Sequence, residues 1–341
     1  MWHLKIDSQK AKKYKDKLVD FYEKSFNRDG HKKIRGSEDF SFEDQTSTKA
    51  YNFLTKTQVD EYLDATPAKM IELHNTLFHT ILGEDSNQED WIDVINNLDK
   101  KRTEDKPLLT ELLVIKKVFN YESYIDAKTD FSYWLAELIG TNTCVYCNRQ
   151  YTLTIRESNT QEGLVRPTFD HWLPQKYYPD LALSFYNLIP SCSLCNSSLK
   201  HDDAILPGQY IYPYGSKGAG FDFTYRELAK HKYMVDTNIT TTDNEEREKV
   251  KRTMSMFHIK DIYNAHADFE LKDLMNLSQQ YPGDYVDTLI SNVMKDLNVS
   301  RSDVYRLIFG VESNPDKYLD RPMSKFKMDI IGEIRKSLSK K

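Results

Sequence analysis

Four cysteines arranged as two Cys-x-x-Cys pairs constrain this chain more than any other feature. The pairs are Cys144 with Cys147 and Cys192 with Cys195, and the 341 residues contain no other cysteine. Two such pairs can supply four thiolates to one tetrahedral Zn²⁺. A reducing compartment favours this interpretation over disulfides, while a redox pair or a chance pairing of buried thiols remains an alternative. The sequence therefore predicts a structural Zn²⁺ bound by all four cysteines.

Composition places the chain among folded globular proteins. Hydrophobic residues make up 39% of the 341 positions and aromatic residues 12%, enough for one large domain or two to three ordinary ones. The net charge of -5 excludes a uniformly basic nucleic-acid coat, although a local cationic groove is compatible with it. No apolar leader begins the sequence, and no stretch approaches the roughly 18 apolar residues of a membrane span. We expect a cytoplasmic protein without membrane contact.

Helical periodicity dominates both ends of the chain. Apolar residues at helical spacing predict a helix over 70–81 that ends near Gly83, and a second helix that begins behind Pro107. Residues 326, 330 and 334 predict a C-terminal helix that buries one face. His258 and His266 are expected to be ordinary helix residues.

The middle of the chain has a composition that favours strands over helices. Residues 151–155 and 167–172 are rich in β-branched and aromatic side chains, which predicts two short strands with a turn at 157–163 between them. The glycine-containing run 213–220 reads as a linker. We therefore expect a mostly helical α+β protein with three parts: an N-terminal helical region (1–140), a zinc-stapled module (141–215) and a C-terminal helical region (216–341).

Polar residues gather beside the cysteines in the sequence. A closed site of four cysteines has no open position for an activated water, so any catalysis must lie elsewhere. If a helix begins near Cys195, Asn196 and Lys200 lie on one face of it. Asp170 and His171 are neighbours, and neighbours in a strand point to opposite faces, so they can share a site only where the strand ends.

Three motifs carry a resemblance to a known family. The runs CVYC, DHWLP and NLIPSCSLCNSSLK, within residues 144–200, resemble the core of HNH nucleases, a ββα-metal motif, in its zinc-stapled form. The resemblance implies that His171 is a general base and that Asn187 orders the loop that orients it. It also implies that Asp170 and Asn196 bind a catalytic Mg²⁺ or Mn²⁺. The last of these positions is often histidine in the family.

The residue chemistry agrees with phosphodiester hydrolysis. A neutral imidazole, with an ordinary pKa of about 6.5, can take a proton from water at cellular pH. A hard cation on Asp170 and Asn196 would act as a Lewis acid, and Lys200 could hold a neighbouring phosphate. Plainer interpretations exist for each: a packed core histidine for His171, a capping residue for Asp170, a solvated helix face for Lys200.

The function expected from the sequence is that of a metal-dependent endonuclease, with DNA favoured because most HNH relatives cut DNA. The run 169–192 is also similar to bacterial HNH proteins that accompany ABC-type or related ATPases in anti-phage defence, as in Septu-like systems, which implies an ATPase partner. The alternatives are a non-catalytic, zinc-held nucleic-acid-binding or adaptor protein and an RNA-cutting toxin. A basic stretch over 10–35 is either a solvated amphipathic helix or a contact to a nucleic-acid backbone.

Overall fold

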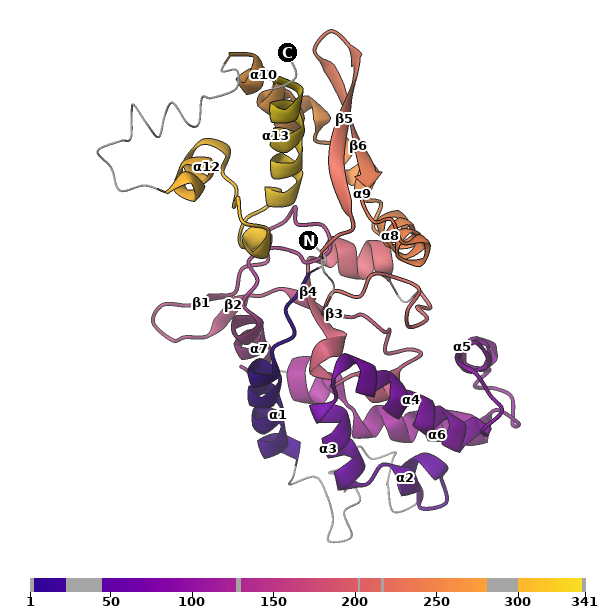
Figure 1. The fold of residues 1–341 in the computed structure, drawn as a ribbon. Coiled ribbons are helices and arrows are strands. Elements are labelled where there is room, and N and C mark those ends of the chain that lie inside the picture. Colours follow the sequence, from indigo (N-terminus) through magenta and orange to yellow (C-terminus); the bar gives the residue numbers. More distant parts are fainter. Residues whose placement is uncertain are drawn as a thin grey trace.

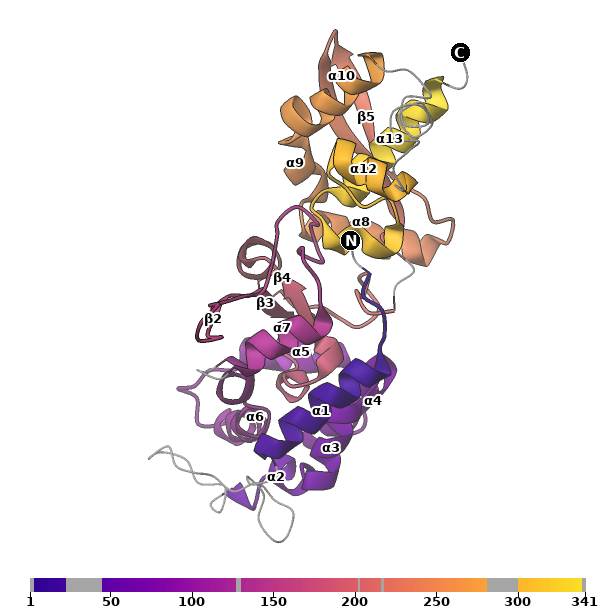
Figure 2. The ribbon, with the colours of Figure 1, turned by 90° about the vertical axis from the view of Figure 1, so that its left-hand side faces the viewer.

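The computed structural model describes residues 3–22, 45–126, 130–201, 203–215, 218–280 and 300–338. Figures 1 and 2 show three regions along one long axis: the N-terminal helices at one end, the strands β3 and β4 near the centre, and the C-terminal helices with a long hairpin at the other end. The protein is mostly helical with small sheets, which confirms the expected α+β class. Within the described residues, no helix has the length and apolar character needed to cross a bilayer.

The N-terminal region is built from short helices that bury one face each. The two predicted helices are confirmed: residues 70, 73, 77 and 81 are all buried in one helix, which ends at Gly83 with a φ of 115°, and Pro107 lies in the first turn of the other. The elements are α1 (Ser8–Tyr22), α2 (Lys49–Phe53), α3 (Lys56–Asp64), α4 (Pro67–Leu82), α5 (Gln88–Asn97), α6 (Lys106–Val118), η3 (Glu122–Asp126) and α7 (Phe131–Ile139). Residues 23–44, which include the second half of the basic stretch, lie outside the described residues.

The middle segment contains two small antiparallel sheets. One pairs β1 (Ile155–Arg156) with β2 (Gly163–Val165), and the other pairs β3 (Thr168–His171) with β4 (Leu188–Ser191). In the second pair Asp170 lies opposite Ile189 and His171 opposite Leu188. Three short helical turns complete the segment: η4 (Pro179–Leu181), η5 (Phe185–Asn187) and η6 (Leu194–Lys200).

The strand prediction was right in one place and wrong in another. The run 167–172 does contain a strand, β3. The run 151–155 does not: only its last residue belongs to β1, and Tyr151 makes an isolated bridge to Thr143. Tyr151 and Ile155 are 56% and 44% exposed. Strand-forming side chains stabilise a sheet by packing against neighbours, and these two side chains are too exposed to do so. The partner of β3 is the later run 188–191, which the sequence analysis left unassigned.

The C-terminal region combines helices with a hairpin that the sequence analysis did not predict. The expectation of a helical region is wrong for β5 (Phe221–Ala229) and β6 (Lys232–Ile239), which pair along most of their length. The alternation of buried Phe221, Phe223, Tyr233 and Val235 was the available signal. The remaining elements are α8 (Asn244–Met256), α9 (Ile259–Asn264), η7 (Ala267–Leu271), α10 (Lys272–Gln280), α12 (Arg301–Phe309), η9 (Pro315–Asp320) and α13 (Ser324–Leu338).

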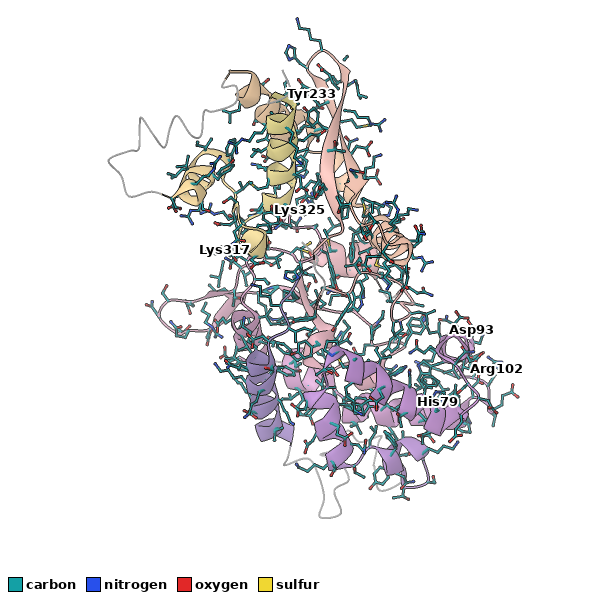
Figure 3. All side chains as sticks on the ribbon, viewed as in Figure 1. His79, Asp93, Arg102, Tyr233, Lys317 and Lys325 are labelled. Atoms are coloured by element: carbon teal, nitrogen blue, oxygen red, sulfur yellow. The ribbon has the colours of Figure 1, made fainter. Side chains whose placement is uncertain are left out.

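The predicted C-terminal helix is α13, and its buried face packs on the hairpin. Phe326, Ile330 and Ile334 are buried, as the spacing predicted. The ring of Phe326 meets that of Phe223 on β5 edge to face, with 5.3 Å between the ring centroids. Figure 3 shows Lys325 at the end of this helix that lies nearest the middle segment.

The expected linker is tied to the start of the chain. The backbone N–H of Leu4 donates to the carbonyl of Pro213 over 2.8 Å, and the N–H of Gly215 donates back to the carbonyl of Leu4 over 3.1 Å. Residues 216 and 217 lie outside the described residues. The described part of the run 213–220 is therefore held by backbone hydrogen bonds to the N-terminal segment.

Asn148 joins the C-terminal region to the first cysteine pair. Its side chain is fully buried, and its amide donates to the carbonyls of Tyr318 (2.7 Å) and Arg321 (3.1 Å). Its own carbonyl accepts from the N–H of Met323 at 2.6 Å. Its φ of 49° is in the left-handed region, which asparagine tolerates better than most residues.

We therefore predict that Asn148→Ala lowers the free energy of unfolding by about 2–4 kcal/mol, since it removes buried hydrogen bonds and strains a left-handed residue. Denaturant unfolding monitored by circular dichroism measures this. The control is Asn238→Ala at an exposed position on β6, which should change stability by less than about 0.5 kcal/mol. Equal effects of the two substitutions would contradict the assigned role of Asn148.

Candidate functional site

The four cysteines form one buried cluster. Cys144 and Cys147 follow α7, Cys192 follows β4, and Cys195 lies in η6. Their Sγ atoms all lie within 4.8 Å of one another. Four sulfurs at about 2.3 Å from one tetrahedral ion lie about 3.8 Å apart, which fits this spacing. The cluster could therefore hold a metal ion such as zinc.

The environment of the cluster favours a metal over redox chemistry. All four thiols are buried and none is in a disulfide, whereas redox cysteine pairs are partly exposed. Burial raises the pKa of the Cys144 thiol well above its usual value, so a Cys144 thiolate at this place needs a cation to stabilise it. The N–H of Arg149 also points at Cys147 Sγ, 3.5 Å away.

Asp170 lies in a buried ion pair. Its side chain is on β3 and the residue is 3% exposed. Lys200 Nζ lies 3.1 Å from Asp170 Oδ1, and Lys200 also donates to the backbone carbonyl of His171 over 2.7 Å. Lys200 is fully buried, so the structure places it neither on a solvated helix face nor where a phosphate could reach it. It links the two neighbours Asp170 and His171 instead.

Tyr146 is the second partner of Asp170, and the sequence analysis missed it. Its hydroxyl donates to Asp170 Oδ2 over 2.5 Å. Burial, and then the negative charge of Asp170, raise the pKa of Tyr146 well above its usual value, so the hydroxyl keeps its proton and remains a donor. The available signal was the position of Tyr146 between the two cysteines of CVYC, because a metal ion bound by these cysteines would hold Tyr146 against β3.

His171 lies half-buried at the end of β3 with its ring held from two sides. Its Nε2 is 3.0 Å from the carbonyl oxygen of Ala182. A carbonyl can only accept, so Nε2 carries the proton and, in the neutral ring, Nδ1 keeps the lone pair. The ring of Tyr121, from the N-terminal region, packs edge-on with the ring centroids 4.7 Å apart. Tyr121 is a second neighbour that the sequence analysis did not identify.

Asn187 holds the connection between β3 and β4. Its Oδ1 accepts from the N–H of Leu173 at 2.8 Å, and its Nδ2 donates to the carbonyls of Leu173 and Leu181, both at 3.1 Å. The residue is fully buried. This arrangement is consistent with the loop-ordering role that the HNH resemblance implies.

The two residues implied as ligands of a catalytic cation do not form an open cation site in this arrangement. Asn196 lies half-buried on η6, directly after Cys195. The carboxylate of Asp170 is nearly inaccessible to solvent, and its oxygens accept from Lys200 and Tyr146. A hard divalent cation would need several oxygen ligands, commonly including water, at this place. The ammonium of Lys200 already neutralises the carboxylate there.

Similarity to known proteins adds no identification. No protein-family model matches the chain, no curated protein matches it, and no solved structure matches it. Among the described residues, the four cysteines are the one group of three or more His, Cys, Asp or Glu side chains placed to hold a metal ion.

Because all four cysteines surround one point, we predict about one bound metal ion per purified chain, measured by elemental analysis. Cys195→Ser should lower both the metal content and the midpoint of thermal unfolding, since metal binding contributes to folding free energy. Ser193→Ala, at an exposed position in the same knuckle, is the matched control and should leave both unchanged. A metal-free, fully stable wild-type protein would overturn the metal centre.

A second prediction concerns the buried ion pair. Lys200→Met preserves much of the side-chain length but leaves Asp170 buried without its counter-charge, so the free energy of unfolding should fall by about 3–5 kcal/mol. Adding Asp170→Asn should recover part of that loss, because the unpaired charge is then removed. Lys232→Met, at an exposed position on β6, is the control. If Lys200→Met is no more destabilising than this control, the pair does not form in solution.

Proposed function

We propose that this chain hydrolyses phosphodiester bonds of nucleic acid, DNA in the first instance, with His171 as the general base. The observation that supports this best is the hydrogen bond between His171 Nε2 and the Ala182 carbonyl. It places the ring proton on Nε2 and so leaves Nδ1 as a proton acceptor. A general base needs a nitrogen in that state, held in a fixed orientation.

The order of elements also supports an HNH-type module. Two antiparallel strands, β3 and β4, are followed directly by the helical turn η6. The cysteine cluster connects the start of this turn to the knuckle at 144–147. We propose that the ion in the cluster is a structural Zn²⁺, because four thiolates with no open position suit a tetrahedral ion of that kind.

In the proposed mechanism the protein's own residues position and move one proton. His171 Nδ1 removes a proton from a water molecule as the water oxygen attacks the phosphorus atom. The bond from phosphorus to the leaving sugar oxygen breaks, and that oxygen takes a proton from solvent. Lys200 fixes the end of β3 by holding the His171 carbonyl, and Asn187 fixes the loop that carries Ala182. The family resemblance also implies Mg²⁺ or Mn²⁺ at Asp170 and Asn196. The arrangement described here does not fit that cation, so no step is assigned to it.

The burial of Asp170 favours one competing function. A carboxylate that is 3% exposed and paired with Lys200 is also what a non-catalytic, zinc-held adaptor or nucleic-acid-binding protein would retain for structure. Such a protein would bind nucleic acid or a partner without cutting. A nuclease would consume its nucleic-acid substrate, whereas an adaptor or binding protein would not. A toxin specific for RNA would consume RNA but not DNA.

The proposal extends to a partner and a context by resemblance alone. The run 169–192 is similar to defence proteins that accompany ATPases, so we propose an ABC-type or related ATPase as the partner and invading nucleic acid as the target. Plasmid DNA, linear DNA and RNA should each be incubated with Mg²⁺, with Mn²⁺ and with EDTA, in the presence and absence of any ATPase that is encoded beside this chain.

On a substrate that the wild type cleaves, His171→Ala should reduce the rate by about 10²- to 10⁴-fold, because a positioned general base is lost. The fold, the metal content and the affinity for substrate should be retained. The control is His79→Ala on α4, a histidine that Figure 3 shows at the outer edge of the N-terminal helices, together with Arg102 and Asp93. Cleavage by His171→Ala at the wild-type rate would exclude this mechanism, and the adaptor function would replace it.

A further inference from the structure

The loop between β3 and β4 is anchored by side chains from far upstream in the sequence. Trp91 Nε1 donates to the carbonyl of Tyr177 over 2.6 Å. The hydroxyl of Tyr14 donates to the carbonyl of Leu183 over 2.7 Å. Both donors belong to the N-terminal region, on α5 and α1. The loop that holds His171 is therefore itself held by the N-terminal helices.

The strongest of these anchors is a buried contact between a histidine and a carboxylate. His74, on α4, places Nδ1 2.9 Å and 3.1 Å from the two carboxylate oxygens of Asp180, in η4. Each side chain is 1% exposed. A hydrogen bond to an ionised carboxylate is about twice as strong as one between neutral groups, and low solvent access strengthens it further.

The direction of this hydrogen bond follows from its surroundings. An ionised carboxylate only accepts, so His74 Nδ1 carries a proton. His74 Nε2 is buried without a hydrogen-bond partner in the described residues, beside the rings of Phe78, Trp91 and Tyr178. An N–H there would have no acceptor, which favours the neutral Nδ1–H tautomer. The pair is thus a one-way donor–acceptor contact.

Asp180 lies close in sequence to the carbonyl group that contacts the proposed general base. Asp180 is two residues before Ala182, whose carbonyl accepts from His171 Nε2. The residues between them form a tight turn, in which the N–H of Ala182 donates to the carbonyl of Pro179 over 3.4 Å. The carbonyl of Leu181, in the same turn, accepts from Asn187. A displacement of Asp180 would therefore move the carbonyl that orients His171.

From these contacts we propose that His74 and Asp180 are positioning residues for the reaction. They fix the Ala182 carbonyl, and through it the Nε2–H tautomer and the orientation of the His171 ring. This inference rests on the proposed function of His171. Neither residue touches the reacting atoms, and the N-terminal helices become part of the catalytic apparatus through this pair.

The first test reads the tautomer of His171 directly and needs no substrate. The protein has nine histidines, so ¹⁵N-histidine labelling gives few ring signals, and His171→Gln identifies the one that belongs to position 171. Spectra are recorded at about pH 8, where an ordinary imidazole is neutral. The wild type should show Nε2–H at His171. His74→Leu should show a mixture of both tautomers, and His74→Asn, whose amide can still donate to Asp180, should resemble the wild type.

The control separates positioning from loss of stability. Leu77→Ala removes a buried side chain from the same helix, and Leu77 is 2% exposed. It should destabilise the fold but leave the His171 tautomer unchanged. If His74→Leu fails to fold, Asp180→Asn takes its place in the test. This substitution keeps an acceptor for His74 but removes the negative charge. We expect it to change the His171 tautomer in the same direction as His74→Leu, but by less. An unchanged tautomer in the folded variant, or an equal change in Leu77→Ala, overturns the proposal.

The second test uses a substrate on which the wild type is active. His74→Leu, or Asp180→Asn where His74→Leu does not fold, should lower kcat by about 10- to 100-fold, because the catalytic group is misplaced. KM should stay within about twofold of the wild-type value. His74→Asn should recover most of that loss. If the wild type cleaves and the variant matches it, only the positioning role fails. If the wild type cleaves nothing, the proposed function fails, while the tautomer measurement still decides whether the pair controls His171.

Discussion

The buried cluster of four cysteines is the constraint on which the centre of this protein depends. It joins two stretches of chain some fifty residues apart, the knuckle after α7 and the start of η6. Each stretch delivers one partner to the same carboxylate: Tyr146 comes from the first and Lys200 from the second. A cation that gathers the thiols would hold the two stretches that carry these partners beside β3. Both partners of Asp170 on β3 therefore come from stretches that the cysteine cluster brings together.

The flanking regions are attached to this centre by specific hydrogen bonds. On one side, Asn148 and the hydroxyl of Tyr263, which donates to the Cys147 carbonyl over 2.7 Å, connect the first knuckle to the C-terminal region. On the other side, Tyr14, His74 and Trp91 reach the loop between β3 and β4. A small two-stranded sheet is marginal by itself, and these contacts provide the support that it needs.

Much of the organisation could be predicted from the sequence. Periodic apolar residues identified α4, α6 and α13, because one buried face per helix leaves a clear period. The cysteine spacing identified one four-sulfur cluster, since few other arrangements use two such pairs. The failures have physical causes too. The run 151–155 has strand-forming residues, but its two ends, Tyr151 and Ile155, are exposed. The hairpin β5–β6 was hidden because buried and more exposed residues alternate clearly only over the first few residues of each strand.

The sequence by itself determined which residues stand near one another along the chain: the cysteine pairs, the neighbours Asp170 and His171, and Asn187, Asn196 and Lys200 a short distance on. Only the tertiary structure decided how they are used. It turned Lys200 inward to Asp170, placed the Ala182 carbonyl on His171, and brought His74 from α4 to the loop at Asp180. Burial and hydrogen-bond partners depend on residues distant in sequence, which no local pattern records, and those partners fix which oxygen or nitrogen can accept a proton.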